Sequence, residues 1–194
     1  MIKKTFALTA LLLSLCTAAR AQEIALKTNL LYDATATVNV GVEIGLAPKW
    51  TLDLSGNYNG WTFDDGKHWK HWLAQPEARY WFCDRFGRHF IAAHALGGQY
   101  NFGNFDGGYN FLGTNLHKLK DKHYQGWFVG FGVAYGYAWM LGAHWNLEAE
   151  IGIGYAYTKF DSYPCAKCGT KIESDKSHHY VGPTKAAVNL VYVF

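Results

Sequence analysis

A period-two alternation of apolar residues with small or polar ones constrains this chain more than any other feature. From Trp127 to Trp139 every second residue is aromatic or valine, and most residues between them are glycine or alanine. Trp145–Tyr157 and Val38–Leu46 alternate in the same way. Successive side chains of a β-strand point to opposite faces, whereas a helix repeats every 3.6 residues. The sequence therefore predicts strands along most of its length and no long helix.

Eight strands are predicted by this pattern, within two to four residues at each end. They cover 24–33, 37–46, 50–60, 73–83, 88–101, 124–139, 144–159 and 180–194. Short turns join alternate pairs of strands, and long connections at about 61–72, 102–123 and 160–179 join the other pairs. The first connection, 34–36, is an exception, because it is short where a long one is expected. Short turns on one rim and long loops on the other are typical of outer-membrane barrels. The expected fold is all-β, an eight-stranded antiparallel transmembrane β-barrel with an up-and-down meander, short periplasmic turns and longer extracellular loops.

Composition favours a membrane barrel over a soluble sandwich or a lipocalin-like barrel. Charged residues make up only 17% of the chain, against about 25% in soluble domains. A soluble barrel would bury its apolar face, but the opposite face here is glycine, alanine and a few charges, which is too little volume for a core. These residues suit a narrow polar lumen. Aromatic residues near strand ends are expected to form interfacial girdles: Trp50, Trp127, Trp139, Trp145 and Tyr157.

The first 21 residues have the organisation of a secretory signal peptide. Lys3 and Lys4 precede an apolar run over 6–15, and Ala19-Arg20-Ala21 supplies small residues for cleavage. The apolar run is too short for a transmembrane anchor. We expect export to the outer membrane and a barrel domain over 22–194.

Removal of residues 1–21 would change the charge balance of the chain. They hold three of the 18 basic residues and none of the 15 acidic ones, so residues 22–194 carry 15 of each. A chain with no net charge gives no indication of a nucleic-acid partner.

The last predicted strand ends on alternating apolar residues: Leu190, Tyr192 and Phe194. A terminal aromatic residue on an alternating strand is similar to the assembly signal of bacterial outer-membrane barrels. The expected partners are therefore the barrel insertion machinery and outer-membrane lipid.

Several segments resemble an uncharacterised family of small outer-membrane barrels from Bacteroidota, OmpA-like in architecture. They are 27–33 (KTNLLYD), 60–63 (GWTF), 69–72 (WKHW), 76–81 (PEARYW), 164–169 (PCAKCG) and 182–187 (GPTKAA). Genes of this family often lie beside those for fimbrial subunits. The resemblance implies location and fold, and a fimbria-related role only through gene neighbourhood.

Strand phase places eight charged residues on the expected interior face: Lys27, Glu43, Asp53, Glu77, Arg79, Glu148, Glu150 and Lys185. Charges in a narrow lumen must be paired or hydrogen-bonded. We interpret the set as an interior salt-bridge network with Arg79 bridging acids of neighbouring strands. Alternatives are a gated ion path and a carboxylate pair acting as acid and base.

Cys165 and Cys168 form a Cys-x-x-Cys motif, the most specific short motif in the sequence, and lie in the last long loop. The spacing suits a small disulfide in an exported protein, or half of a zinc site completed by His178 and His179. Redox activity is disfavoured because no helix is predicted to lower the thiol pKa.

The three long connections (61–72, 102–123 and 160–179) are candidate surfaces for an extracellular protein or glycan. A hydrolase would need a nucleophilic serine near a histidine and an acid. Residues 22–194 hold serine only at 55, 162, 174 and 177, and His94 has no serine beside it in sequence. We therefore predict no enzymatic activity and no cofactor. The expected role is structural, anchoring or surface recognition, in support of an assembly such as fimbriae, with a small gated channel and a lipid-modifying enzyme as alternatives.

Overall fold

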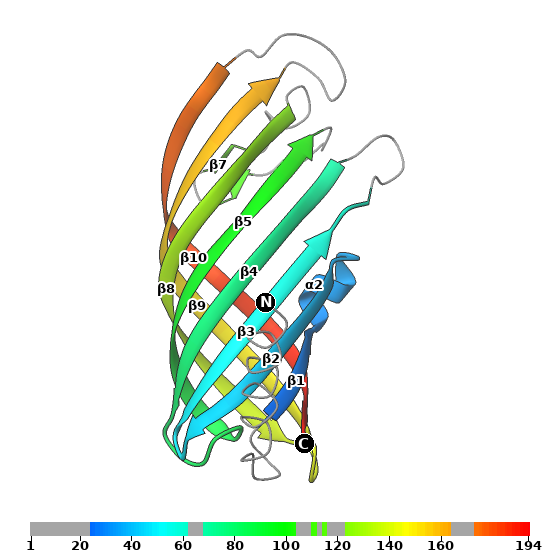
Figure 1. The fold of residues 1–194 in the computed structure, drawn as a ribbon, viewed down its shortest axis with the longest axis vertical. Coiled ribbons are helices and arrows are strands. Elements are labelled where there is room, and N and C mark those ends of the chain that lie inside the picture. Colours follow the sequence, from blue (N-terminus) through cyan, green and yellow to red (C-terminus); the bar gives the residue numbers. More distant parts are fainter. Residues whose placement is uncertain (1–23, 62–67, 104–109, 112–113, 116–122, 164–172) are drawn as a thin grey trace, which may run out of the picture.

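A computed structural model describes residues 24–61, 68–103, 110–111, 114–115, 123–163 and 173–194. Eight antiparallel strands form a closed barrel in a meander, and the last strand pairs with the first (Figure 1). The strands are β1 (Ile24–Asn29), β2 (Val38–Ala47), β3 (Trp50–Asn59), β4 (His68–Trp81), β5 (Arg88–Gly103), β8 (His123–Met140), β9 (Trp145–Tyr163) and β10 (Glu173–Val193). The short strands β6 (Asn110–Phe111) and β7 (Thr114–Asn115) pair separately. The prediction of eight antiparallel strands in a meander is confirmed.

The predicted end of the first strand is wrong. Strand β1 stops at Asn29, and α2 (Leu30–Ala34) follows it as a single helical segment. The Asn29 side chain accepts a hydrogen bond from the Leu31 backbone N–H at 3.1 Å, which is the role of an N-cap residue. The apolar pair Leu30-Leu31 therefore belongs to an exposed helical turn and not to the alternating strand.

The strands lengthen steadily around the ring, from six residues in β1 to 21 in β10. The wall from β4 to β10 consequently rises above the rim where α2 lies (Figure 1). The predicted starts at 73 and 180 are wrong, because β4 begins at His68 and β10 at Glu173. These extensions lack apolar alternation, but they pair in the ladder, as Ser177 does with Lys159. Parts of the three expected loops are therefore strand.

The polarity of the barrel is the inverse of that of a soluble protein. Large apolar side chains such as Val38, Phe131, Val133 and Ile151 are exposed on the outer face. Charged and amide side chains are buried on the inner face. In the part of the chain that the structure describes, no helix is long and apolar enough to cross a membrane.

Aromatic rings close the lumen at the end opposite α2. Phe90 packs on Trp81 with ring centroids 4.6 Å apart, and Phe86 lies 6.3 Å from Trp81. Phe86 belongs to the turn between β4 and β5 and has a φ of 64°. Asn146 on β9 holds this turn by donating to the Phe86 carbonyl at 2.6 Å. We call Trp81, Phe86 and Phe90 the aromatic plug.

Interior glycines allow neighbouring strands to approach closely. A Cβ placed on Gly154 would meet the Phe131 carbonyl oxygen and would lie 2.6 Å from the Gly132 Cα. On the outer face, by contrast, a Cβ on Gly56 would meet nothing within 4 Å.

We therefore expect Gly154→Ala to destabilise the barrel and Gly56→Ala to be tolerated. The first change forces backbone movement, which costs about 1–3 kcal/mol in a packed interior. The second should stay within about 1 kcal/mol of the wild type. Urea unfolding of barrels refolded in detergent micelles would measure both, and equal midpoints for the two variants would contradict the close approach.

Candidate functional site

Arg79 on β4 lies at the centre of the lumen and is completely buried. Its guanidinium is within ion-pair distance of all five carboxylates that the sequence places inside. The separations are 2.5 Å from Nε to Glu77, 3.0 Å from Nη1 to both Glu43 and Glu148, and 3.0 and 2.8 Å from Nη2 to Asp53 and Glu150. A guanidinium offers five N–H donors in a rigid fork, which suits a hub of several carboxylates.

Two lysines complete the charge network. Lys27 on β1 pairs with Glu43, with Asp53 at 3.4 Å and with Glu148 at 3.3 Å. Lys185 on β10 pairs with Glu77 at 2.6 Å and with Glu150 at 3.4 Å. The structure thus brings together all eight residues predicted from strand phase, and we call this set the charge network.

The strand register explains why the carboxylates need these cations. Glu43 on β2 lies directly opposite Asp53 on β3, and Asp53 lies opposite Glu77 on β4. Like charges in directly opposed positions repel each other. Arg79 follows Glu77 by two residues and therefore points to the same inner face, where its guanidinium separates the acids.

Uncharged side chains donate further hydrogen bonds to the buried carboxylates. Thr51 donates to Glu43, and Asn189 donates to Glu148 at 2.8 Å. Five carboxylates face three cations, so the network is acidic when all groups are ionised. Among the described residues, the Asp53 Oδ1 and Glu150 Oε1 atoms are buried without a hydrogen-bond partner.

The space around the charge network is filled at both ends. The Arg79 Cζ lies 4.6 Å from the centre of the Phe90 ring, so the aromatic plug contacts the network directly. Toward α2 the lumen is lined by buried amide side chains: Asn29, Asn57, Asn59, Gln75 and Asn189. A cavity of about 30 Å³ remains beside Tyr32 and Asp53, enough for one or two water molecules.

His94 and Thr184 adjoin the charge network, and neither was predicted as a site residue. The His94 Nε2 is 2.9 Å from the Thr184 hydroxyl, and its Nδ1 is 3.7 Å from Glu77. The order hydroxyl, imidazole, carboxylate matches a nucleophilic triad. However, 3.7 Å is too long for a hydrogen bond, and Glu77 is already paired with Arg79 and Lys185. We therefore assign His94 to the polar packing of the lumen.

Thr184 reaches His94 because of a β-bulge. The pairing of β10 with β9 shifts between Pro183 and Lys185, which lets both Thr184 and Lys185 face inward. The histidine could have been predicted from its phase on β5, but the bulge has no signal in the alternation.

Other predicted features lie elsewhere. Cys165 and Cys168 fall outside the described residues, and within the described ranges no group of histidine, cysteine or acidic residues has the arrangement of a metal site. His178 is exposed, while the His179 Nδ1 is 2.5 Å from the Tyr155 hydroxyl. Of the serines, Ser55 donates to the Gln75 carbonyl and Ser177 is exposed.

The residues of the predicted assembly signal lie on or beside β10. Leu190 pairs with Thr28 of β1, and Tyr192 pairs with Leu26. The half-exposed Phe194 packs edge-on against Tyr192, with ring centroids 5.0 Å apart.

Replacement of Arg79 should disrupt the charge network. We expect Arg79→Met to lose about 3–5 kcal/mol of folding free energy, because carboxylates stay buried without their central partner. The exposed Arg88 on β5 supplies a matched control, Arg88→Met. Urea titration of refolded barrels, followed by tryptophan fluorescence, would compare them. An Arg79→Met barrel with the wild-type midpoint would mean that the network is not held by Arg79.

Comparison with protein-family models identifies a family for this chain. The family model described as "Protein of unknown function (DUF3575)" matches residues 7–194, nearly the whole chain. No curated protein and no solved structure matches the sequence.

Proposed function

The chain belongs to the DUF3575 family, and we propose that it is an outer-membrane barrel with a closed lumen that acts as an anchor and recognition surface. The observation that carries the proposal is the inverted polarity: charges are paired inside and large apolar side chains are exposed outside. Such a surface is unfavourable in water and favourable in lipid.

The dimensions of the apolar outer face support a membrane location. Trp127 and Trp139, at the two ends of this face on β8, are both about half exposed. Twelve residues span about 40 Å along a strand, and about 28 Å of height at a tilt of about 45°. This height is close to the roughly 25 Å apolar band of outer-membrane barrels. Trp50 and Trp145 are exposed in the same way and suit an interfacial girdle.

The filled lumen favours an anchor over a channel. An ion path would have to cross both the aromatic plug and the charge network, whose eight members are bound to one another. Opening it would separate buried ion pairs, at a cost of several kcal/mol.

The taller wall favours recognition at the α2 end. We place this end outside the cell, because the longer connections from β3 to β4, from β5 to β8 and from β9 to β10 leave from it, and we place the short turns in the periplasm. The partner would be an extracellular protein or glycan, such as a component of a fimbrial assembly.

Shortening the segment 104–122 should then abolish binding of the partner without affecting barrel folding. Crosslinking of wild-type and shortened protein in intact outer membranes would compare partner capture.

Planar-bilayer recording tests the closed lumen. The refolded full chain should float with lipid vesicles and give no single-channel openings. An open barrel of known conductance, reconstituted in the same way, controls for insertion. Regular openings of the inserted protein would contradict the closed lumen and favour the channel. Failure of the protein to float with vesicles would contradict the membrane location.

A charge on the outer face tests the membrane location by a second route. Val133, near the middle of the apolar face on β8, is 60% exposed. We expect Val133→Arg to cost about 2–4 kcal/mol in lipid vesicles. Gln125→Arg, on the same strand and face but beyond Trp127, should be tolerated. Equal losses for the two variants would mean that the apolar face does not lie in lipid.

A further inference from the structure

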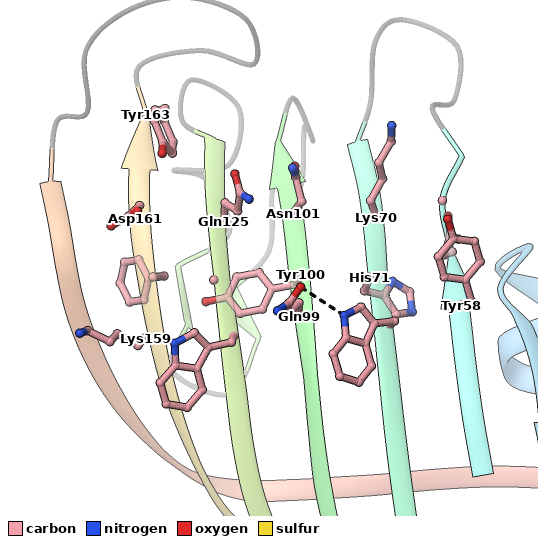
Figure 2. Close-up of a pocket in the computed structure, with 16 residues that line it drawn as sticks. Tyr58, Lys70, His71, Gln99, Tyr100, Asn101, Gln125, Lys159, Asp161 and Tyr163 are labelled. Atoms are coloured by element: carbon pink, nitrogen blue, oxygen red, sulfur yellow. Dashed lines mark hydrogen bonds between the residues drawn. The ribbon is translucent and has the colours of Figure 1, made fainter. Parts of the chain in front are cut away.

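The outer wall of the barrel has a shallow hollow of about 590 Å³ near its α2 end (Figure 2). Outward-pointing side chains border it in two cross-strand rows. The row nearer the middle of the wall holds Trp72, Gln99, Trp127 and Lys159, and the next holds Lys70, Asn101, Gln125 and Asp161. The Trp72 Nε1 donates to Gln99 at 3.3 Å, drawn as the dashed line in Figure 2. The outer face therefore changes from apolar to polar across these rows.

A second hollow of about 610 Å³ lies on the same wall nearer the other end and is lined almost entirely by apolar side chains. Ala78 on β4 and Ala93 on β5 form its floor. Larger side chains surround them, including Trp50, Tyr80 and Val133.

Small outward residues on β4 and β5 join the two hollows. They are Ala74, Pro76 and Ala78 on β4, and Ala93, Ala95 and Gly97 on β5. Exposed larger side chains flank them on both sides: Leu54 on β3, and Val129, Phe131 and Val133 on β8. The space above the floor is open, since a Cβ on Gly97 would have no neighbour nearer than 3.8 Å. We call this depression the outer furrow.

The dimensions of the outer furrow suit one alkyl chain. Its flanking strands β3 and β8 are three strand spacings apart, or about 14 Å, and the side chains of both walls narrow this gap. From Trp72 to Tyr80 it extends about 27 Å along β4, or about 19 Å in depth at a tilt of about 45°. Half of the hydrocarbon core is about 15 Å thick.

The shape and charge of the surface distinguish between occupants. A symmetric dimer would place two copies of the same concave furrow face to face, which leaves a void that no side chain fills. A lipid chain can fill the furrow, and Lys70 in the hollow at its α2 end can contact a negative head group.

We infer that the outer furrow holds an acyl chain of one anionic lipid, whose head group lies against Lys70 and the Trp72–Gln99 pair. The inference rests on the proposed membrane location. Polar donors at one end and an apolar floor at the other meet the two halves of such a molecule.

Native mass spectrometry of the full chain in detergent tests this assignment, with equal amounts of phosphatidylglycerol and phosphatidylcholine added. The wild type should retain one phosphatidylglycerol molecule, with a preference of about fivefold, the effect of one lysine near an anionic head group. Ala95→Phe fills the furrow and should abolish retention. Ala186→Phe, an exposed outer position on β10, should retain the lipid as the wild type does. Lys70→Gln should lower the preference toward onefold.

Heat-dependent electrophoretic mobility checks that each variant folds, and Ala93→Leu replaces Ala95→Phe if the latter does not. Equal retention by the floor variant and the wild type would overturn the inference, as would equal retention of both lipids. If the wild type were a dimer and Ala95→Phe were a monomer, the furrow would be the contact site of a second copy and not of a lipid. A protein that floats with vesicles but retains no lipid would contradict this inference alone, whereas one that retains lipid but does not float would contradict the proposed function.

Discussion

The pairing of Arg79 with five carboxylates is the interaction on which the rest of this barrel depends. Isolated charges in a lumen without bulk water would cost many kcal/mol. The acids come from β2, β3, β4 and β9, and the cations from β1, β4 and β10. The network is therefore complete only when β10 pairs with β1. Closure of the ring and neutralisation of the charges stabilise each other, which favours a single cooperative folded state.

Strand phase was sufficient to predict the charge network because a period of two leaves only two faces. Once the alternating large apolar residues of the strands, such as those of Trp127–Trp139, were assigned to the outer face, Glu77 and Arg79 could only lie inside. Contacts that depend on a break in that period were not predictable. The β-bulge next to Pro183 brings Thr184 to His94, and the Asn29 cap turns an apolar pair into a helix.

The ends of the strands were hard to predict for a different reason. Apolar alternation marks the part of a strand that exposes apolar side chains on the outer face, so it stops where the outer face becomes polar. On β9 this change lies near Lys159, but hydrogen-bonded pairing with β8 continues to Tyr163. The backbone ladder does not depend on side-chain polarity. The part of the wall beyond the apolar face was therefore predicted as loop, although it is strand.

Small residues have two separate effects in this wall. Inside, Gly154 allows close packing of β9 against β8. Outside, Ala93 and Ala95 lower the surface between the exposed side chains of β3 and β8. Because neighbouring residues of a strand face opposite sides, Ala95 points outward while His94 points into the lumen beside the charge network. A change at Ala95 thus alters what the barrel presents to its surroundings and leaves the charges that hold it closed. The outer surface can in this way acquire a binding role without a cost to folding.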